Sequence, residues 1–353
     1  MKEESESMNA TERIEKLLKD GRADRVPVSG WMHMPLLDRK PEEFAEASIR
    51  QTDAARFDFL KIMSNAYCMA EAYGAGIDFV EDETRWQRPF RSYPVTDAVS
   101  LANIPVLTAE NPVFQREAKL IGLLQEHYQG SMPLIATVFN PVTWLKYMAD
   151  QEKTPVRYFM EEHKKELHSF CERMLQSICN QLDMLMEKGI AGIFLASQFS
   201  CRSEISPELF QEFCAPYEKA ILQHVKGKTW FNMLHIHGVR DLYFEEVLDY
   251  NVEAINWENC PDGVRDDPGI ISLAQAHRMT DKVLICGVDR IQDFLGGYEQ
   301  VRDKMLQRLQ EALAECGGER LVFCPGCGIP VGTDPQKLNT MAEAVDLCES
   351  AHF

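Results

Sequence analysis

The feature that most constrains the fold is a set of eight short apolar runs, rich in β-branched and aromatic residues. Each has roughly the length of a buried strand. The runs are Val26–Trp31, Phe57–Met63, Pro133–Phe139, Ala191–Ser197, Thr229–His235, Val252–Trp257, Val283–Val288 and Leu321–Cys324. Segments with helical periodicity separate most of them, as the crossovers of parallel strands require. The pattern predicts an α/β fold, a single (β/α)8 TIM barrel, whose reactive residues lie at the carboxyl ends of the strands.

Two segments fall outside this alternation. Residues 1–21 are predicted to be an N-terminal extension with one helix, which is capped by Thr11 and ends at Gly21. Residues from about 77 to 108 follow the second strand, and their aromatic and proline residues predict an inserted hairpin or lid. Residues 22–353 form the barrel domain in this interpretation.

Helix signals support the same organisation. A capping side chain precedes proline at Ser206-Pro207, Asp267-Pro268 and Asp334-Pro335, and each pair predicts the start of a helix. An apolar stripe of period 3.6 predicts one long amphipathic helix over residues 155–188.

Charge and composition exclude several classes of partner. The net charge of -18 would repel nucleic acid on average. The chain has neither a signal-peptide core nor the run of about 18 apolar residues that spans a bilayer, so we expect a soluble, cytoplasmic protein without membrane contact. Eleven cysteines in such a chain are expected to be reduced. No phosphate-binding loop, dinucleotide fingerprint or serine-hydrolase elbow occurs.

Two histidines end the fifth predicted strand, in the segment TWFNMLHIHG. His235 and His237 are two residues apart, so strand geometry places both imidazoles on one face. Neutral imidazoles at a barrel mouth are half of a zinc site. The alternative is a hydrogen-bonded pair of histidines at a strand end.

A thiol is expected at the same end of the barrel. Cys324 and Cys327 follow the eighth strand in the segment FCPGCG, where glycines permit close approach to the backbone. Alone, the C-x-x-C spacing also fits a redox pair or two core cysteines. Together with the histidines it favours a catalytic zinc held by His235, His237 and Cys327, with one open position. Cys324 is a candidate fourth ligand, and a fourth ligand would close the site.

Other polar residues at predicted strand ends are candidates for orienting a cofactor or a metal ligand. Capping of loops explains each of them equally well. They are Asn140, Gln198, Glu258 and Asp289, with Tyr147 on the helix after the third strand as a candidate cavity wall.

Five segments together resemble the uroporphyrinogen decarboxylase superfamily, from about Arg22 to the end of the chain. They are Pro133–Met148, Ile205–Tyr217, Asn251–Trp257, Val283–Asp289 and Pro325–Met341. The resemblance implies a barrel enzyme, either a tetrapyrrole decarboxylase or a zinc-dependent, corrinoid-linked methyltransferase.

The branch is decided by the residues at the family's functional positions. The early motif Gly30–Met34 lacks arginine, the second strand ends without a carboxylate, and Cys327 replaces the late histidine of the decarboxylases. The methyltransferase branch holds zinc with H-x-C and the cysteine of P-G-C-G; here His237 stands in place of the middle cysteine. The resemblance therefore implies a metal one unit more positive than in that branch and a less nucleophilic bound thiolate.

The leading hypothesis is a methyltransferase that uses Zn2+ and moves a methyl group between a corrinoid (methylcobalamin), carried by a separate small protein, and a thiol or methylated small molecule. One alternative is a decarboxylase of the uroporphyrinogen type. The other is a non-catalytic protein that binds a corrinoid or tetrapyrrole.

Overall fold

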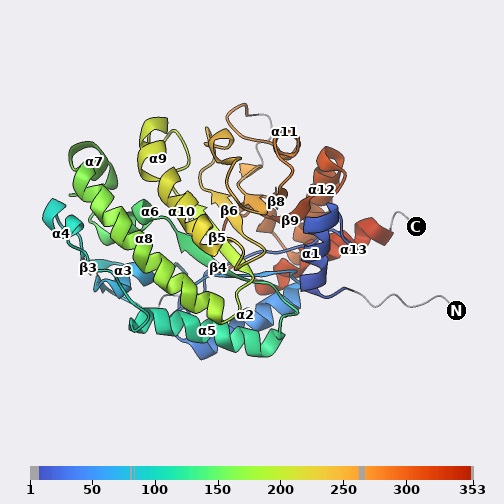
Figure 1. Cartoon of the computed structure of the whole chain (residues 1–353). Coiled ribbons are helices and arrows are strands. Elements are labelled where there is room, and N and C mark those ends of the chain that lie inside the picture. The colour runs from blue at the N-terminus through green and yellow to red at the C-terminus, as the bar shows by residue number, and fades with distance from the viewer. Residues whose placement is uncertain (1–7, 80–81, 83, 262–266, 351–353) are drawn as a thin grey trace.

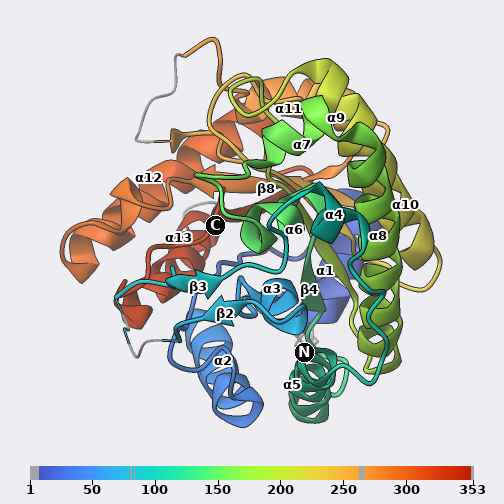
Figure 2. The same ribbon diagram turned by 90° about the vertical axis from the view of Figure 1, so that its left-hand side faces the viewer.

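The computed structural model describes residues 8–79, 82, 84–261 and 267–350. Within these ranges seven parallel strands form one curved sheet that helices surround, a TIM-barrel-like α/β fold (Figure 1 and Figure 2). Neighbouring strands of the sheet follow one another along the chain. The strands are β1 (Leu60–Ile62), β4 (Leu134–Phe139), β5 (Gly192–Ser197), β6 (Met233–Ile236), β7 (Ala254–Asn256), β8 (Val283–Val288) and β9 (Leu321–Pro325).

Helices pack on the outside of this sheet and connect its strands. The longer ones are α1 (Ala10–Asp20), α2 (Pro41–Ala55), α5 (Pro112–Tyr128), α8 (Lys164–Glu187), α10 (Ala215–Val225), α12 (Tyr298–Cys316) and α13 (Thr340–Ser350). The shorter ones are α3 (Cys68–Ala72), α4 (Ala98–Ala102), α6 (Pro141–Met148), α7 (Val156–Glu162), α9 (Pro207–Phe213) and α11 (Leu273–Met279), with 3-10 turns η1 (Glu245–Val247), η3 (Gln292–Phe294) and η4 (Pro335–Asn339).

The first predicted strand, Val26–Trp31, is wrong as a regular strand. Val28 makes a single parallel bridge with Phe323 of β9. Pro27 has no N–H to donate, which prevents a continuous ladder. Its carbonyl accepts from the Phe323 N–H (2.9 Å), while the Val28 carbonyl accepts from the Asp58 N–H (2.8 Å). An irregular segment thus lies between the two edge strands of the sheet.

The concave face of the sheet carries its own apolar cluster. Its strand members recur at alternate positions, as one face of a strand requires. They include Ile135, Phe194, Ala196, Met233, Ala254, Val283, Ile285, Val322 and Cys324, and Phe59 and Phe231 join them from just before β1 and β6. Helix α1 adds Ile14 and Leu17 to this cluster. Because the Thr11 N–H donates to Ser131, just before β4, α1 covers the amino ends of the strands.

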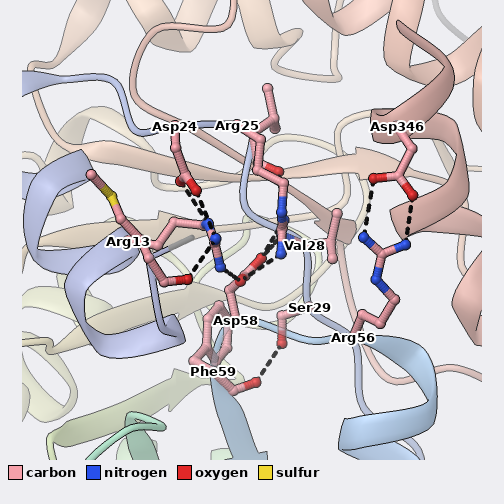
Figure 3. A network of polar contacts seen from close by, with 11 residues as sticks. Arg13, Asp24, Arg25, Val28, Ser29, Arg56, Asp58, Phe59 and Asp346 are labelled. Atoms are coloured by element: carbon pink, nitrogen blue, oxygen red, sulfur yellow. Dashed lines mark hydrogen bonds and ion pairs between the residues drawn. The ribbon is translucent and has the colours of Figure 1, made fainter. Parts of the chain in front are cut away.

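Asp58 anchors a buried polar network at this amino end (Figure 3). Its carboxylate accepts from Arg13 of α1 at 2.7 Å and from Arg25 at 2.8 and 2.9 Å. It also accepts the Val28 N–H at 2.8 Å, and Asp24 pairs with the other side of Arg13 at 2.7 Å. The network joins α1, the segment before Val26 and the start of β1.

The hairpin predicted within residues 77–108 is present. Strands β2 (Gly76–Ile77) and β3 (Phe90–Ser92) pair antiparallel and lie in the foreground of Figure 2. Its role as a lid stays a prediction, as does the domain boundary after residue 21.

Three helix predictions are wrong. The N-terminal helix α1 is capped by Asn9, which forms a capping box with Glu12, and not by Thr11. The expected long helix over residues 155–188 is interrupted at His163, between α7 and α8. Asp267-Pro268 forms a turn, and α11 begins only at Leu273, where Ser272 and Gln275 make a capping box. Ser206 caps α9 as predicted, and Asp334 caps the η4 turn that leads into α13.

None of the helices in the described residues is both long and apolar enough to cross a bilayer. None of the eleven cysteines forms a disulfide bond in the structure, and the reduced state of their thiols stays a prediction.

Candidate metal centre

A cavity of about 430 Å³ opens at the carboxyl ends of the strands. Its volume lies in the range of small-molecule sites. Aromatic side chains form much of its wall, among them Trp31, Trp86, Phe139, Tyr147 and Phe194. The inserted hairpin contributes Thr84–Gln87, and Trp86 stacks on His33 with 5.0 Å between ring centroids. This end of the fold is therefore the place for a ligand.

The three predicted metal ligands meet in this cavity. His235 ends the inner face of β6, His237 follows two residues later, and Cys327 lies in the loop after β9. Their ligand atoms all lie within 4.8 Å of one another. The two nearest imidazole nitrogens, His235 Nε2 and His237 Nδ1, are 3.4 Å apart.

The donor set fits zinc. Two nitrogens bound to one tetrahedral zinc at the usual length of about 2.0–2.1 Å lie roughly 3.4 Å apart, as they do here. Imidazole and thiolate are the ligands that zinc prefers in proteins. Three protein ligands leave one position for a substrate atom, which is typical of catalytic sites.

Asn256 of β7 fixes the tautomer of His235. Its Oδ1 lies 2.6 Å from His235 Nδ1, and its Nδ2 donates to the carbonyl of Ile285 at 2.7 Å. An amide oriented in this way can only accept from Nδ1, which leaves a lone pair on Nε2 facing His237. Burial lowers the pKa of His235 to about 4, although the Asn256 hydrogen bond opposes this shift, so the ring is neutral at pH 7.

Gly326 explains how Cys327 reaches the cavity. A Cβ at this position would lie 2.5 Å from both the Trp257 carbonyl oxygen and the Glu258 Cα. Only glycine lets the loop after β9 pack so closely on the backbone after β7. The glycines were expected to let a ligand approach the backbone closely. At Gly326 the group that approaches is instead the protein's own backbone at Trp257 and Glu258.

Cys324 is not one of the converging residues. It is fully buried in β9 and belongs to the cluster on the concave face. Burial raises the pKa of its thiol well above the ordinary value, although Lys61 opposes the shift. The fourth position is therefore not taken by this thiol.

Two of the predicted cofactor-binding residues line the cavity. Gln198 Nε2 donates to the Tyr147 hydroxyl at 2.9 Å, so the two side chains form one polar spot in the wall. Burial raises the pKa of Tyr147 to about 12, and the hydroxyl therefore keeps its proton. Glu258 lies next to the cavity and forms an ion pair of 3.1 Å with Arg290, which lines it.

The side chains of the other two predicted residues accept hydrogen bonds from backbone N–H groups at the starts of a helix and a turn. Asn140 caps α6, and its Nδ2 donates to Glu218 at 2.5 Å in a fully buried cluster. The Asp289 carboxylate accepts the N–H groups of Ile291 and Gln292 in the turn after β8. Neither residue is among those that line the cavity.

Sequence reasoning missed Lys61 and Asn256. Lys61 lies in β1 and lines the cavity, where its ammonium group packs 4.6 Å from the Phe194 ring centroid. A lysine between Phe59 and Met63, at alternate positions of an apolar run, was the available signal. Asn256 is likewise a polar residue inside an apolar run.

Comparison with known proteins shows the family to which the chain belongs. The model of the uroporphyrinogen decarboxylase (URO-D) family matches residues 10–347, and the chain belongs to this family. The uroporphyrinogen decarboxylase of Dictyostelium discoideum is 24% identical over 194 residues, 54% of this chain, and the match spans about half of that protein (51%). The uroporphyrinogen decarboxylase of Myxococcus xanthus is 22% identical over 314 residues, 88% of this chain and 84% of that protein.

Solved structures show the same fold. A methyltransferase from Methanosarcina mazei superposes with a TM-score of 0.77 at 17% identity, covering 97% of this chain and 100% of that one. A B12-independent methionine synthase from Shewanella sp. W3-18-1 superposes with a TM-score of 0.60 at 14% identity, covering 93% and 99%. At these identities the likeness concerns the fold alone.

Proposed function

We propose that this protein is a zinc-dependent methyltransferase that moves a methyl group between a corrinoid, carried by a small partner protein, and a thiol or methylated small molecule. The observation that carries the proposal is the convergence of His235, His237 and Cys327 in a cavity of about 430 Å³. Decarboxylation of a tetrapyrrole has no use for such a donor set. Family membership and the methyltransferase among the structural neighbours agree with the proposal.

Zinc held there would act as a Lewis acid that lowers the pKa of a thiol or polarises a departing heteroatom. The chain's own residues prepare the site. Burial keeps the His235 imidazole neutral, while Asn256 and the Phe194 ring, which stacks on it with 5.1 Å between centroids, hold it in its orientation. The aromatic wall excludes water from the reacting sulfur, which strengthens electrostatic interactions inside. Zn2+ held by two neutral imidazoles and one thiolate would give the site a net charge near +1.

Metal analysis tests the proposal. Purified wild-type protein is expected to contain about one zinc per chain, and Cys327→Ser and His237→Ala are expected to lose it. Cys324→Ser is the matched control and is expected to retain zinc, because that thiol lies outside the group. Transfer of methyl from methylcobalamin to a small thiol, followed by absorbance, is expected only with the metal-loaded protein. Full transfer activity in a zinc-free sample would contradict the proposal.

The decarboxylase remains a second candidate because the curated relatives carry that name. Incubation with uroporphyrinogen distinguishes the two activities. Loss of carboxylates from the tetrapyrrole, unaffected by Cys327→Ser, would favour it.

A further inference from the structure

Arg290 contacts two of the loops that surround the candidate metal centre. It follows β8, and its side chain lines the cavity. Its Nε forms an ion pair of 3.1 Å with Glu258 in the loop after β7. Its Nη1 donates to the carbonyl of Gly328, in the loop after β9, at 3.5 Å. One guanidinium group therefore joins the carboxyl ends of three neighbouring strands.

The two contacts nearest to Cys327 lie on opposite sides of it in the chain. On one side the carbonyl of Pro325 accepts from Asn256 Nδ2 at 3.2 Å. On the other side the carbonyl of Gly328 accepts from Arg290. The segment that carries the thiol is thus held at both ends by side chains of neighbouring elements.

The loop depends on such contacts because glycine occupies both positions beside the cysteine. Glycine has the largest conformational freedom of all residues and offers no side chain that could hold a loop in place. Before Cys327, close packing of Gly326 on the Trp257 and Glu258 backbone restricts the chain. After Cys327, a Cβ at Gly328 would meet only side-chain atoms, none nearer than 3.6 Å. Hydrogen bonding therefore matters more on this second side.

Charge also links Arg290 to the thiol. Burial, the largest influence, lowers the pKa of Arg290, but Glu258 and the Cys327 thiol outweigh it, so the guanidinium group stays charged. The arginine side chain is 32% exposed, and ion pairs near the surface contribute little to stability. Stability alone therefore does not account for this arrangement.

We propose that Arg290 is a positioning residue that holds the Cys327 thiol toward the two histidines. It does so by linking the Gly328 carbonyl to the Glu258 carboxylate. The inference rests on the proposed function in one respect, that Cys327 binds the metal. Without Arg290 the loop loses a charge-assisted hydrogen bond directly after the ligand, and the thiol is no longer held in place for the metal.

Titration of the metal-free full chain with Co2+ tests the inference, because sulfur-to-cobalt charge transfer gives an absorption that reports the bond to Cys327. Arg290→Gln is expected to bind Co2+ about tenfold more weakly than wild type, the lower end of the usual effect of residues that orient metal ligands. Arg290→Lys keeps the charge but loses the planar fork that reaches two acceptors, and it is expected to recover only part of the affinity.

Measurement at pH 7 and at pH 9 separates position from charge. A cation that merely stabilised the thiolate form of Cys327 would matter less at pH 9, where most of an ordinary thiol is ionised. A residue that positions the loop matters equally at both pH values. The loss of affinity in Arg290→Gln is therefore expected to persist at pH 9.

Arg240→Gln is the matched control. Arg240 follows β6 and also pairs with a carboxylate, that of Asp267 at 2.6 Å, but it is not among the described residues that line the cavity. It is expected to bind Co2+ as wild type does. Thermal unfolding monitors folding, and Arg290→Met replaces the glutamine variant if that variant does not fold. Wild-type affinity in Arg290→Gln, a loss that disappears at pH 9, or an equal loss in Arg240→Gln would overturn the inference.

The same titration distinguishes this inference from the proposed function. Wild-type protein that binds Co2+ through Cys327 but transfers no methyl group would contradict the methyltransferase, and the Arg290→Gln titration would still decide the positioning role. Methyl transfer by wild type together with equal Co2+ affinity in Arg290→Gln would overturn the positioning role alone. Wild-type protein without the sulfur-to-cobalt absorption would overturn both.

Discussion

Asp58 and Lys61 are three residues apart in the sequence, yet their surroundings differ completely. Asp58, at the amino end of β1, is 1% exposed and accepts hydrogen bonds from two arginines and a backbone N–H (Figure 3). Lys61, which faces the cavity, is 7% exposed and contacts aromatic rings and a thioether. Within three residues the chain thus passes from a fully paired charge to one with no carboxylate partner among the described residues.

The difference separates stability from binding. A buried charge that protein groups pair completely holds segments together, because removal of either partner leaves the other desolvated. A buried charge without a protein partner costs stability and remains available to a ligand. Asp58 at the amino end of the sheet is of the first kind, and Lys61 in the cavity, which has no carboxylate partner among the described residues, is of the second.

Asp58→Ala is expected to have the largest effect on stability. It leaves Arg13 and Arg25 buried without their counter-charge and is expected to lower the free energy of unfolding by about 3–5 kcal/mol. Denaturant unfolding followed by circular dichroism measures this. The control is Asp346→Ala, whose ion pair with Arg56 is 46% and 45% exposed and should contribute less than about 1 kcal/mol. Similar losses in the two variants would contradict the comparison.

Asn256→Ala is expected to affect metal binding at the carboxyl end. Without the amide oxygen, His235 loses the hydrogen bond that fixes its tautomer, and zinc affinity is expected to fall about 10- to 100-fold. Competition with a chelator measures the affinity. Asn256→Asp retains an acceptor for His235 and is expected to recover part of it. Wild-type affinity in Asn256→Ala would show that stacking on Phe194 suffices to orient the ring.

Lys61→Met is expected to increase stability modestly. Replacing a buried charge that has no carboxylate partner among the described residues by an apolar side chain of similar length should raise the free energy of unfolding at pH 7 by about 1 kcal/mol. Chemical denaturation of wild type and variant, both metal-free, measures the difference. A loss of stability as large as that of Asp58→Ala would show that Lys61 is structural.

The sign of the pH dependence sharpens this test. Burial lowers the pKa of Lys61 to about 7, so the unfolded chain binds more protons than the folded one between pH 7 and the ordinary lysine pKa. The cost of Lys61 to wild-type stability therefore falls as pH rises through this window, and the advantage of Lys61→Met is expected to be largest near pH 7 and to shrink toward pH 10. The groups that face Lys61 are Cys324, Cys327, His33 and His235.

Seven of the eight apolar runs became strands, because a run of β-branched residues bounded by helices has few other ways to bury itself. The exception is the run with Pro27, whose missing N–H breaks the ladder. The H-x-H and P-G-C-G segments meet because the carboxyl ends of parallel strands share one edge.

Local sequence could not distinguish polar residues that cap helices or turns from polar residues that line the cavity. Asn140 and Gln198 both follow strands, yet Asn140 caps a helix and Gln198 lines the cavity. Only the packing of neighbouring elements decides between these roles.

The order of apolar runs and the identity of the three candidate metal ligands were determined by the sequence alone, since strand periodicity and donor chemistry are local properties. Tertiary structure decided which polar groups have partners. Lys61 is unusual because segments distant in sequence place aromatic rings around its ammonium group, and none of the described residues that line the cavity is a carboxylate. Whether a charged side chain has a partner depends on which distant segments the fold places beside it. The spacing of residues along the chain does not contain this information.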